Sequence, residues 1–287
     1  MEKYIVKGNE ILIEFLKKMF SNLSKNSVKS LLHNEKVFVN GNMTTKYNYE
    51  LNIGDVVEIR EKVAKNIDII YEDKDIIVIN KPSGLLTVAT EKEKNKTAYH
   101  LVMEYLKKKN KNNRIFIIHR LDKDTSGILV IAKNDEAHNK LAVQFKDHSI
   151  KREYYALVEG KFSSTTGTIN KPLGRDKKDR IKMAINEDGK RAVTHYEVLE
   201  QYDKGISLVK CTLETGRTHQ IRVHMASIGH PLVGDLVYGY KRQKFNVEGQ
   251  VLHAKTLGFI HPRTNEYMEF TSELPEYFKE LLNKLNS

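Results

Sequence analysis

The sequence predicts a two-domain α+β protein in which a small α/β module precedes a larger domain built on a mixed, largely antiparallel sheet. Helix and strand patterns alternate within about the first sixty residues, a polar connector follows, and short apolar runs with a few helical stretches fill the rest. A chain of 287 residues is long enough to bury one small and one large hydrophobic core. We therefore place the domains at 1–61 and 67–287, joined by a linker at 62–66.

The N-terminal module has the pattern of two helices followed by a hairpin. Apolar residues recur on one broad face of Glu10–Phe20, and a second helical pattern covers Lys25–His33. Lys36–Gly41 has a strand pattern that ends in Asn-Gly, the pair that most strongly favours a two-residue hairpin turn. Val56–Arg60 is the expected last strand of the module.

The larger domain is predicted to mix strands with helices, and its sequence contains no internal repeat. The expected strands are Ile67–Tyr71, Asp75–Asn80, Arg114–Ile118, Ile128–Lys133, Tyr154–Glu159, Arg191–Leu199 and Ile206–Glu214. The expected helices are Thr97–Leu106, Asp135–Phe145, Thr218–Ile228 and Glu276–Leu285. Gly229 directly follows one of these helices and Pro275 directly precedes another, which are the positions that these residues favour.

The charge balance favours a polyanionic partner, because 48 Lys and Arg against 37 Asp and Glu give a net charge of +11. Nucleic acid is the commonest partner of so basic a domain. A lysine-rich solvated surface is the alternative. Two basic clusters occur in the larger domain, Lys107, Lys108, Lys109, Lys111 and Arg114 in one and Arg175, Lys177, Lys178, Arg180 and Lys182 in the other. Clusters of this kind favour contacts with a phosphate backbone.

Cysteine use and hydropathy predict a cytoplasmic location and no membrane contact. The single cysteine, Cys211, excludes an internal disulfide and fits a reducing compartment. It lies in the apolar run Leu208–Leu213, so we expect a buried, unreactive thiol. No apolar run approaches the roughly 20 residues that span a bilayer, and the charged N-terminus lacks a signal-peptide core.

The most informative segment is 119–127, His-Arg-Leu-Asp-Lys-Asp-Thr-Ser-Gly. The apolar runs Ile115–Ile118 and Ile128–Ile131 flank it, and we expect both to be buried strands. Polar residues between buried strands cost free energy unless they have partners. The segment is therefore predicted to be part of a site.

Within this segment, Asp122 is a candidate nucleophile or base and Arg120 is a candidate phosphate contact. On residue type alone, Asp124 serves as well as Asp122. A purely structural role for either aspartate, in a turn or a helix cap, is the third alternative. The run Gly216-Arg217-Thr218 before an expected helix is a further candidate phosphate site.

Taken together, several motifs resemble those of the RluA family of pseudouridine synthases. The motifs occur in family order at Asn80–Gly84, His119–Gly127, Lys151–Val158, Leu213–His224 and Leu252–Ala254. The N-terminal module, with Val-Phe-Val-Asn-Gly and Gly-Asp-Val-Val-Glu-Ile, resembles the S4 RNA-binding module. The resemblance implies a pseudouridine synthase fold and isomerisation of specific uridines in structured RNA, without a cofactor or a metal.

The resemblance also implies roles for individual residues. Asp122 matches the aspartate that acts on the ribose of a flipped-out uridine, Tyr154 matches a tyrosine that packs on the target base, and Arg222 matches the arginine that pairs with the aspartate. Tyr155 is an alternative to Tyr154, but the Ala-Leu-Val that follows favours Tyr154. Substrate binding is expected from Arg120, His119, Lys81 and Arg217, and, through the S4-like module, from Lys25, Lys29 and Lys36.

These roles agree with the chemistry of pseudouridine formation, which breaks the N1–C1′ bond and joins C5 to C1′. A carboxylate can attack C1′ or remove a 2′ proton, and the sequence does not choose between them. Either task needs an ionised carboxylate in a confined pocket, and we expect a bidentate pair with Arg222 to keep Asp122 ionised. The target base has to leave its stack to reach the pocket.

Two other functions fit parts of the sequence. A non-catalytic RNA-binding or ribosome-assembly factor would share the charge and the S4-like module, but has no need of a buried carboxylate. A metal-dependent RNA hydrolase would need clustered ligands, and His119, His219, His224, His230 and His253 form no zinc motif in the sequence. The expected partner is large-subunit ribosomal RNA, with transfer RNA as the alternative, and the expected state is a monomer.

Overall fold

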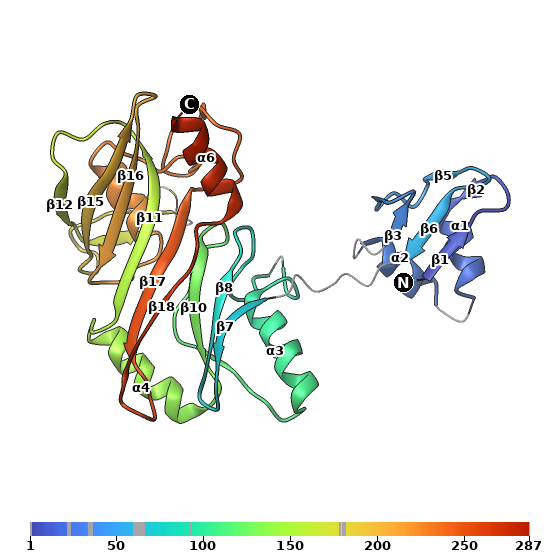
Figure 1. The fold of residues 1–287 in the computed structure, drawn as a ribbon, viewed down its shortest axis with the longest axis horizontal. Helices are drawn as coiled ribbons and strands as arrows, with labels where there is room; N and C mark the ends of the chain where they lie inside the picture. Colours follow the sequence, from blue (N-terminus) through green and yellow to red (C-terminus); the bar gives the residue numbers. More distant parts are fainter. Residues whose placement is uncertain are drawn as a thin grey trace. The chain divides into compact units, whose positions relative to one another are not determined.

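The computed structural model describes residues 2–21, 24–33, 37–59, 67–91, 93–177, 179 and 182–286. The chain divides into two compact units, Met1–Asn66 and Ile67–Ser287 (Figure 1). The expected linker at 62–66 lies outside the described residues, as do Lys36, Lys178 and Arg180.

The N-terminal unit is a small α/β module. Its elements are β1 (Glu2–Ile5), β2 (Glu10–Ile11), α1 (Leu12–Met19), α2 (Lys25–His33), β3 (Val37–Val39), β4 (Asn42–Met43), β5 (Glu50–Leu51) and β6 (Val56–Ile59). Four strands form an antiparallel sheet in the order β1-β6-β3-β4, and β2 pairs with β5. The order of two helices and a hairpin agrees with the prediction, whereas β1 was not predicted.

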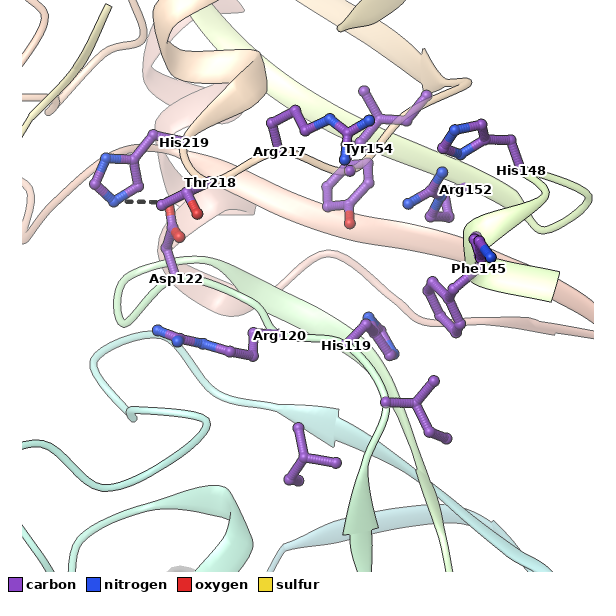
Figure 2. A pocket seen from close by; sticks show the side chains of 15 residues that line it. His119, Arg120, Asp122, Phe145, His148, Arg152, Tyr154, Arg217, Thr218 and His219 are labelled. Atoms are coloured by element: carbon purple, nitrogen blue, oxygen red, sulfur yellow. Dashed lines mark ion pairs between the residues drawn. The ribbon is translucent and has the colours of Figure 1, made fainter. Parts of the chain in front are cut away.

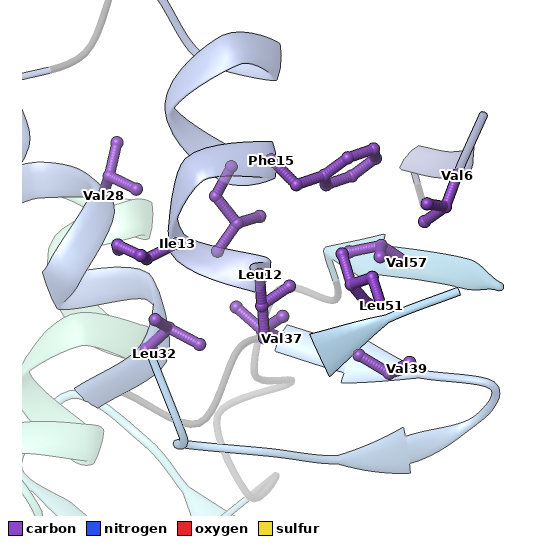
Figure 3. Packing of buried hydrophobic residues seen from close by; sticks show 11 residues of the cluster. Val6, Leu12, Ile13, Phe15, Val28, Leu32, Val37, Val39, Leu51 and Val57 are labelled. Atoms are coloured by element: carbon purple, nitrogen blue, oxygen red, sulfur yellow. The ribbon is translucent and has the colours of Figure 1, made fainter. Parts of the chain in front are cut away.

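One hydrophobic core holds this unit together (Figure 3). It contains Val6, Leu12, Ile13, Phe15, Leu16, Val28, Leu32, Val37, Val39, Leu51 and Val57. Each such side chain contributes about 1.5–3 kcal/mol on full burial. The predicted Asn-Gly turn is confirmed, because Asn40 and Gly41 have φ angles of 49° and 82°, as a type I′ turn between β3 and β4 requires. Helix α1 begins at Leu12 and not at Glu10, because Glu10 and Ile11 pair with β5.

The larger unit is built on a ten-stranded sheet. Its strands are β7 (Asp68–Glu72), β8 (Ile76–Lys81), β9 (Phe116–Ile117), β10 (Ser126–Ala132), β11 (Lys151–Glu159), β12 (Thr166–Asn170), β15 (Val193–Tyr202), β16 (Ile206–Leu213), β17 (Leu252–Ile260) and β18 (Tyr267–Thr271). The main order is β12-β15-β16-β11-β17-β10-β8-β7, with β18 on β17 and β9 on β10. Among the described strands of this sheet only β10 and β17 run parallel, which confirms a mixed, largely antiparallel sheet.

Helices cover both faces of this sheet. They are α3 (Ala98–Lys109), α4 (Asp135–Lys146), α5 (Gln220–Ser227) and α6 (Glu276–Asn286), and a separate hairpin joins β13 (Leu173–Arg175) to β14 (Met183–Ile185). Along β10, Leu129 and Ile131 pack in the cluster that contains α3, whereas Ile128 and Val130 pack in the cluster that contains α4. Burial on both faces explains why the strand is a continuous apolar run. No helix in the described part of the chain is long and apolar enough to cross a membrane.

The parallel contact between β10 and β17 joins the two halves of the sheet at the end of segment 119–127. Gly127 lies opposite Ala254 and has a φ of 112°. A Cβ at Gly127 would overlap the backbone of Ala254. This close approach requires glycine there, and it fixes the loop that carries Asp122 to the centre of the sheet.

Candidate active site

The candidate active site is a cavity of about 510 Å³ in the larger unit (Figure 2). It lies where the loop before β10, the start of β11 and the loop before α5 meet, with the end of α4 at one side. Its polar and charged lining residues are His119, Arg120, Asp122, Lys146, His148, Arg152, Tyr154, Arg217, Thr218 and His219. The cavity therefore joins residues that are far apart in the sequence.

The loop before β10 is held in place by backbone contacts. The amide of Thr125 donates to the carbonyl of Asp122 at 3.2 Å. The buried hydroxyl of Thr87 donates to the carbonyl of Leu121 at 2.8 Å and accepts from the amide of Leu121 at 3.2 Å. Asp122 lines the cavity and Asp124 is not among the lining residues, so the fold separates two aspartates that are equivalent in the sequence.

The carboxylate of Asp122 is partly accessible, with 27% of its side chain exposed. Its Oδ2 atom accepts a hydrogen bond from Nη1 of Arg222 at 3.2 Å and lies 3.8 Å from Nε2 of His219. The carboxylate therefore has a guanidinium on one side and the open cavity on the other. This arrangement suits a group that has to stay charged and still reach a ligand.

Arg222 forms its bidentate pair with Asp235 and not with Asp122, which corrects the sequence expectation. Nε and Nη2 of Arg222 donate to Oδ2 and Oδ1 of Asp235 at 2.7 and 3.0 Å. Only Nη1 remains to reach Asp122, because α5 points the fork of the guanidinium at the loop after it. Burial is the largest effect and raises the pKa of Asp235, but the hydrogen bonds and charge of Arg222, together with the amides of Tyr238 and Val237, lower that pKa overall.

His219, at the start of α5, is held in place by a contact with the loop after that helix. This residue precedes the helix in a left-handed conformation, with φ 56° and ψ 20°. Its Nδ1 lies 2.7 Å from the hydroxyl of Tyr238, and the guanidinium of Arg222 lies 5.0 Å from the centre of the Tyr238 ring. Burial lowers the pKa of His219, although Asp122 opposes this, so we expect a neutral imidazole beside the carboxylate at neutral pH.

Tyr154 lines the cavity at an irregularity in the sheet. The pairing of β11 with β17 shifts between Glu153 and Tyr154, as in a β-bulge, which can re-aim a side chain beside a site. The half-buried ring of Tyr154 packs against two core clusters of the same unit. Burial raises the pKa of its hydroxyl, so the phenol stays protonated at neutral pH. Tyr155 packs in a different cluster, against residues of α6, and is not among the lining residues.

Arg120 and His119, two residues that the sequence predicted as substrate contacts, also line the cavity. Arg120 is exposed. His119 stacks on Phe145 with ring centres 4.5 Å apart, and its Nε2 accepts from the amide of Val130 at 3.2 Å. Burial lowers the pKa of His119 to about 3, so the ring is neutral and carries its proton on Nδ1.

Lys81 was predicted to bind substrate, but the structure places it in the core. The residue is 0% exposed and does not line the cavity. Its ammonium donates to the carbonyls of Pro82, Leu85 and Lys123 at 2.9, 2.7 and 3.1 Å. Burial lowers the pKa of Lys81 to about 7, although nearby carboxylates oppose this effect. Lys81 is therefore a positioning residue that fixes the loop next to Asp122.

Arg217 lines the cavity, but its backbone amide already has a partner. The amide of Arg217 donates to Oε1 of Gln220 at 2.9 Å, so it cannot also bind a phosphate as the sequence suggested. The Nε atom of Arg217 donates to the carbonyl of Arg191 at 2.9 Å.

The predicted RNA contacts of the N-terminal unit lie on and near α2. Lys29 is exposed on α2 and Lys25 is the first residue of that helix. The prediction for Lys36 falls outside the described residues.

Sequence reasoning missed Asp235, Tyr238 and Arg152 as parts of the site. Arg152 lies in the quoted motif Lys151–Val158, so its position was a usable signal. Asp235 and Tyr238 lie in a loop without regular pattern, and their relation to α5 depends on a contact between segments. No described residue of the two predicted basic clusters lines the cavity.

A group of possible metal ligands lies outside the cavity, and its members are bonded to other side chains. Among the described residues, the only cluster with suitable spacing is Asp73, Asp75 and His261, outside the cavity lining. Arg263 donates to both oxygens of Asp75, and His261 bonds to Asp73 at 2.8 Å. Cys211 is buried as predicted, and burial raises the pKa of its thiol to about 12.

Comparisons with known proteins identify relatives over most of the chain. The profile of the family described as "RNA pseudouridylate synthase" matches residues 75–227. A Bacillus subtilis protein named "Uncharacterized RNA pseudouridine synthase YlyB" is 43% identical over 96% of this chain and 94% of its own. A Haemophilus influenzae protein named "Ribosomal large subunit pseudouridine synthase D" is 37% identical over 96% of this chain and 91% of its own.

A solved structure agrees with the fold. The structure titled "Human RNA Pseudouridylate Synthase Domain Containing 1" covers 80% of this chain and 98% of its own, with a TM-score of 0.61 and 27% identity. The match supports the architecture of the larger unit.

Proposed function

The chain belongs to the RNA pseudouridylate synthase family, and from this premise we propose that it converts specific uridines of large-subunit ribosomal RNA to pseudouridine. It is an isomerase that acts on RNA. The observation that carries the proposal is the cavity in which the carboxylate of Asp122, bonded to Arg222, shares a wall with Tyr154. The choice of ribosomal RNA rests on relatives from Haemophilus influenzae and Zymomonas mobilis whose names state that class of substrate.

Asp122 acts on the ribose of a uridine that has left its stack. It attacks C1′ to form an ester bond that breaks when C5 joins C1′, or it removes the 2′ proton and returns it at that step. In both cases N1–C1′ breaks before C5 joins C1′, and at the end C5 loses a proton and N1 gains one. Nη1 of Arg222 lies 3.2 Å from Oδ2 of Asp122 and holds the carboxylate at the cavity wall. The ring of Tyr154 offers a face for the base. Unstacking the target base costs a few kcal/mol, and contacts in the cavity have to offset it.

The N-terminal unit binds RNA as an S4-like module. Support comes from its order of two helices and a hairpin and from the exposed Lys29 on the second helix. The net charge of +11 suits contacts with phosphates. We further propose that the protein acts as a monomer in the cytoplasm.

Loss of tritium from C5 tests the activity, because the new C5–C1′ bond replaces the C5–H bond. Ribosomal RNA transcribed with [5-³H]uridine is incubated with the wild-type chain and with Asp122→Asn. We expect release by the wild type and a fall of at least about a hundredfold in the variant, with binding to RNA kept. Substantial activity of Asp122→Asn would exclude the assigned role.

Mapping of pseudouridines in total RNA from cells with and without the gene identifies the target. A site lost from large-subunit RNA supports the proposal, and a site lost only from transfer RNA changes the substrate class. If no site is lost and no tritium is released, the protein is a non-catalytic RNA-binding factor.

A further inference from the structure

Arg152 is a buried guanidinium without an ionic partner among the described residues. It is 5% exposed, lines the cavity, and extends from the start of β11, two residues before Tyr154. Burial lowers its pKa, Tyr154 opposes this, and the charge of Arg217 lowers it further. A buried charge costs several kcal/mol unless an opposite charge and hydrogen bonds compensate for it.

The hydrogen bonds of Arg152 are incomplete as well. Nη2 donates to the carbonyl of Glu214 at 2.8 Å, but the buried Nε has no hydrogen-bond partner. The guanidinium carbon lies 5.7 Å from the centre of the Phe145 ring, which contributes only a cation–π contact. Nearby on the cavity wall, Nδ1 of His148 is a second buried nitrogen without a partner. Unsatisfied buried groups of this kind are rare and call for an explanation.

Gly216 makes room for this guanidinium. A Cβ at Gly216 would overlap Nη1 of Arg152, whereas the backbone there does not have the positive φ that favours glycine. In Figure 2, Arg152 lies near His148 and Phe145, whereas His219 and Asp122 lie together at another side of the cavity. The guanidinium and the carboxylate thus belong to separate parts of one cavity.

We propose that Arg152, together with Arg217, binds a phosphodiester of the RNA strand next to the uridine that enters the cavity. This inference rests on the proposed function. A phosphate supplies the missing negative charge and the acceptors that the guanidinium lacks, and the planar fork of arginine suits two oxygens of one phosphate. Every internal uridine carries a phosphate on each side, so a ligand that places its ribose at Asp122 always brings such a group.

Inorganic phosphate tests the anion site in the full chain. Phosphate is expected to raise the melting temperature of the wild type above that in chloride of equal ionic strength, since a ligand that binds the folded state stabilises it. Arg152→Met is expected to lose this increment. The matched control is Arg191→Met, which removes an exposed arginine paired with Glu214 and is expected to keep the increment. An equal increment in wild type and Arg152→Met would overturn the proposal.

Gly216→Ala provides a second variant in case Arg152→Met does not fold. The added methyl group displaces the flexible end of Arg152 and leaves its charge in the chain. Loss of the phosphate increment in Gly216→Ala supports the site, and a full increment contradicts it.

A short oligouridylate distinguishes an RNA phosphate from free phosphate. Affinity is measured at several KCl concentrations, and the slope of log K against log salt is expected to be shallower by about 0.7 in Arg152→Met, the value for one lost single-strand contact. An unchanged slope overturns the assignment to RNA, even if inorganic phosphate binds. A wild-type chain that releases no tritium would overturn the proposed function instead. The phosphate and oligouridylate measurements would still test the anion site, because neither depends on catalysis.

Discussion

The guanidinium of Arg222 and the carboxylate of Asp235 form a two-point pair at 2.7 and 3.0 Å, with both side chains almost fully buried. The amides of Val237 and Tyr238 donate to the same carboxylate. The pair fixes the direction of the guanidinium, so that its remaining Nη1 meets Asp122. Asp235 is thus a positioning residue for the carboxylate in the cavity.

Asp235→Asn is expected to lower both stability and turnover. Breaking one side of a buried pair costs about 3–5 kcal/mol, because the other charge remains buried. Turnover is expected to fall further than RNA affinity. The guanidinium of Arg222 is no longer held toward Asp122, whereas the residues that line the cavity are unchanged. Urea unfolding and tritium release measure the two effects.

Asp203→Asn is the control for this change, because Asp203 is an exposed carboxylate paired with Lys161. Asp203→Asn is expected to leave both the unfolding free energy and the rate of tritium release nearly unchanged. Arg222→Ala is expected to lose activity as well, with a changed pH–rate profile. Normal turnover and stability in Asp235→Asn would rule out the positioning role.

Tyr154 and Tyr155 are expected to respond differently to the loss of a hydroxyl. Tyr154→Phe keeps the ring in the cavity, so RNA affinity is expected to change by less than about twofold, while the rate falls if the hydroxyl takes part in proton transfer, typically by about 10²–10⁴-fold. Tyr154→Ala should also weaken RNA binding, since stacking on one base is worth about 1–3 kcal/mol. Tyr155→Phe, on the opposite core cluster, is the control. Equal losses in both phenylalanine variants would contradict the assignment.

Lys81→Met is expected to destabilise the larger unit by at least about 2 kcal/mol, because three carbonyls, one of them in a fully buried hydrogen bond, lose their donor. The loop next to Asp122 loses an anchor, so turnover should fall while RNA affinity is kept. Lys74→Met, at an exposed lysine of the same unit, should stay within about 0.5 kcal/mol of wild type. A stable Lys81→Met variant with weakened RNA binding would instead restore the predicted substrate contact.

Acid unfolding should depend on Asp75. The hydrogen bonds from Arg263 are the largest effect, and they lower the pKa of Asp75 from 3.8 to about 2 although burial opposes them. Because the folded pKa is depressed, the contribution to stability is complete above about pH 4 and is lost as the pH falls through about 2. Asp75→Asn should therefore unfold with a weaker pH dependence between pH 4 and 2 than wild type. An unchanged slope of unfolding free energy against pH would contradict this, and Asp68→Asn serves as the exposed control.

The elements with strong local signals agreed with the prediction. α2 has the predicted bounds, and α3 begins after the capping Thr97, whose side chain accepts from the amide of His100. β12, β13, β14, β17 and β18 were missed. The apolar residues of β17 are interrupted by His253, Lys255 and Thr256, and it is a strand because β10, β11 and β18 lie beside it. Pairing of distant strands leaves little trace in a local pattern.

By itself the sequence determined the α+β class and the motif segment 119–127, because covalent order and residue chemistry are enough for motifs. Through the family resemblance of those motifs it also predicted the set Asp122, Tyr154 and Arg222. Tertiary structure alone decided that Lys81 is a core anchor and that Asp235 directs Arg222. It also placed the unpaired Arg152 in the cavity wall. Burial and hydrogen-bond partners arise from segments far apart in the chain, so residues with the same chemistry in the sequence acquire their roles only when the sheet brings those segments together.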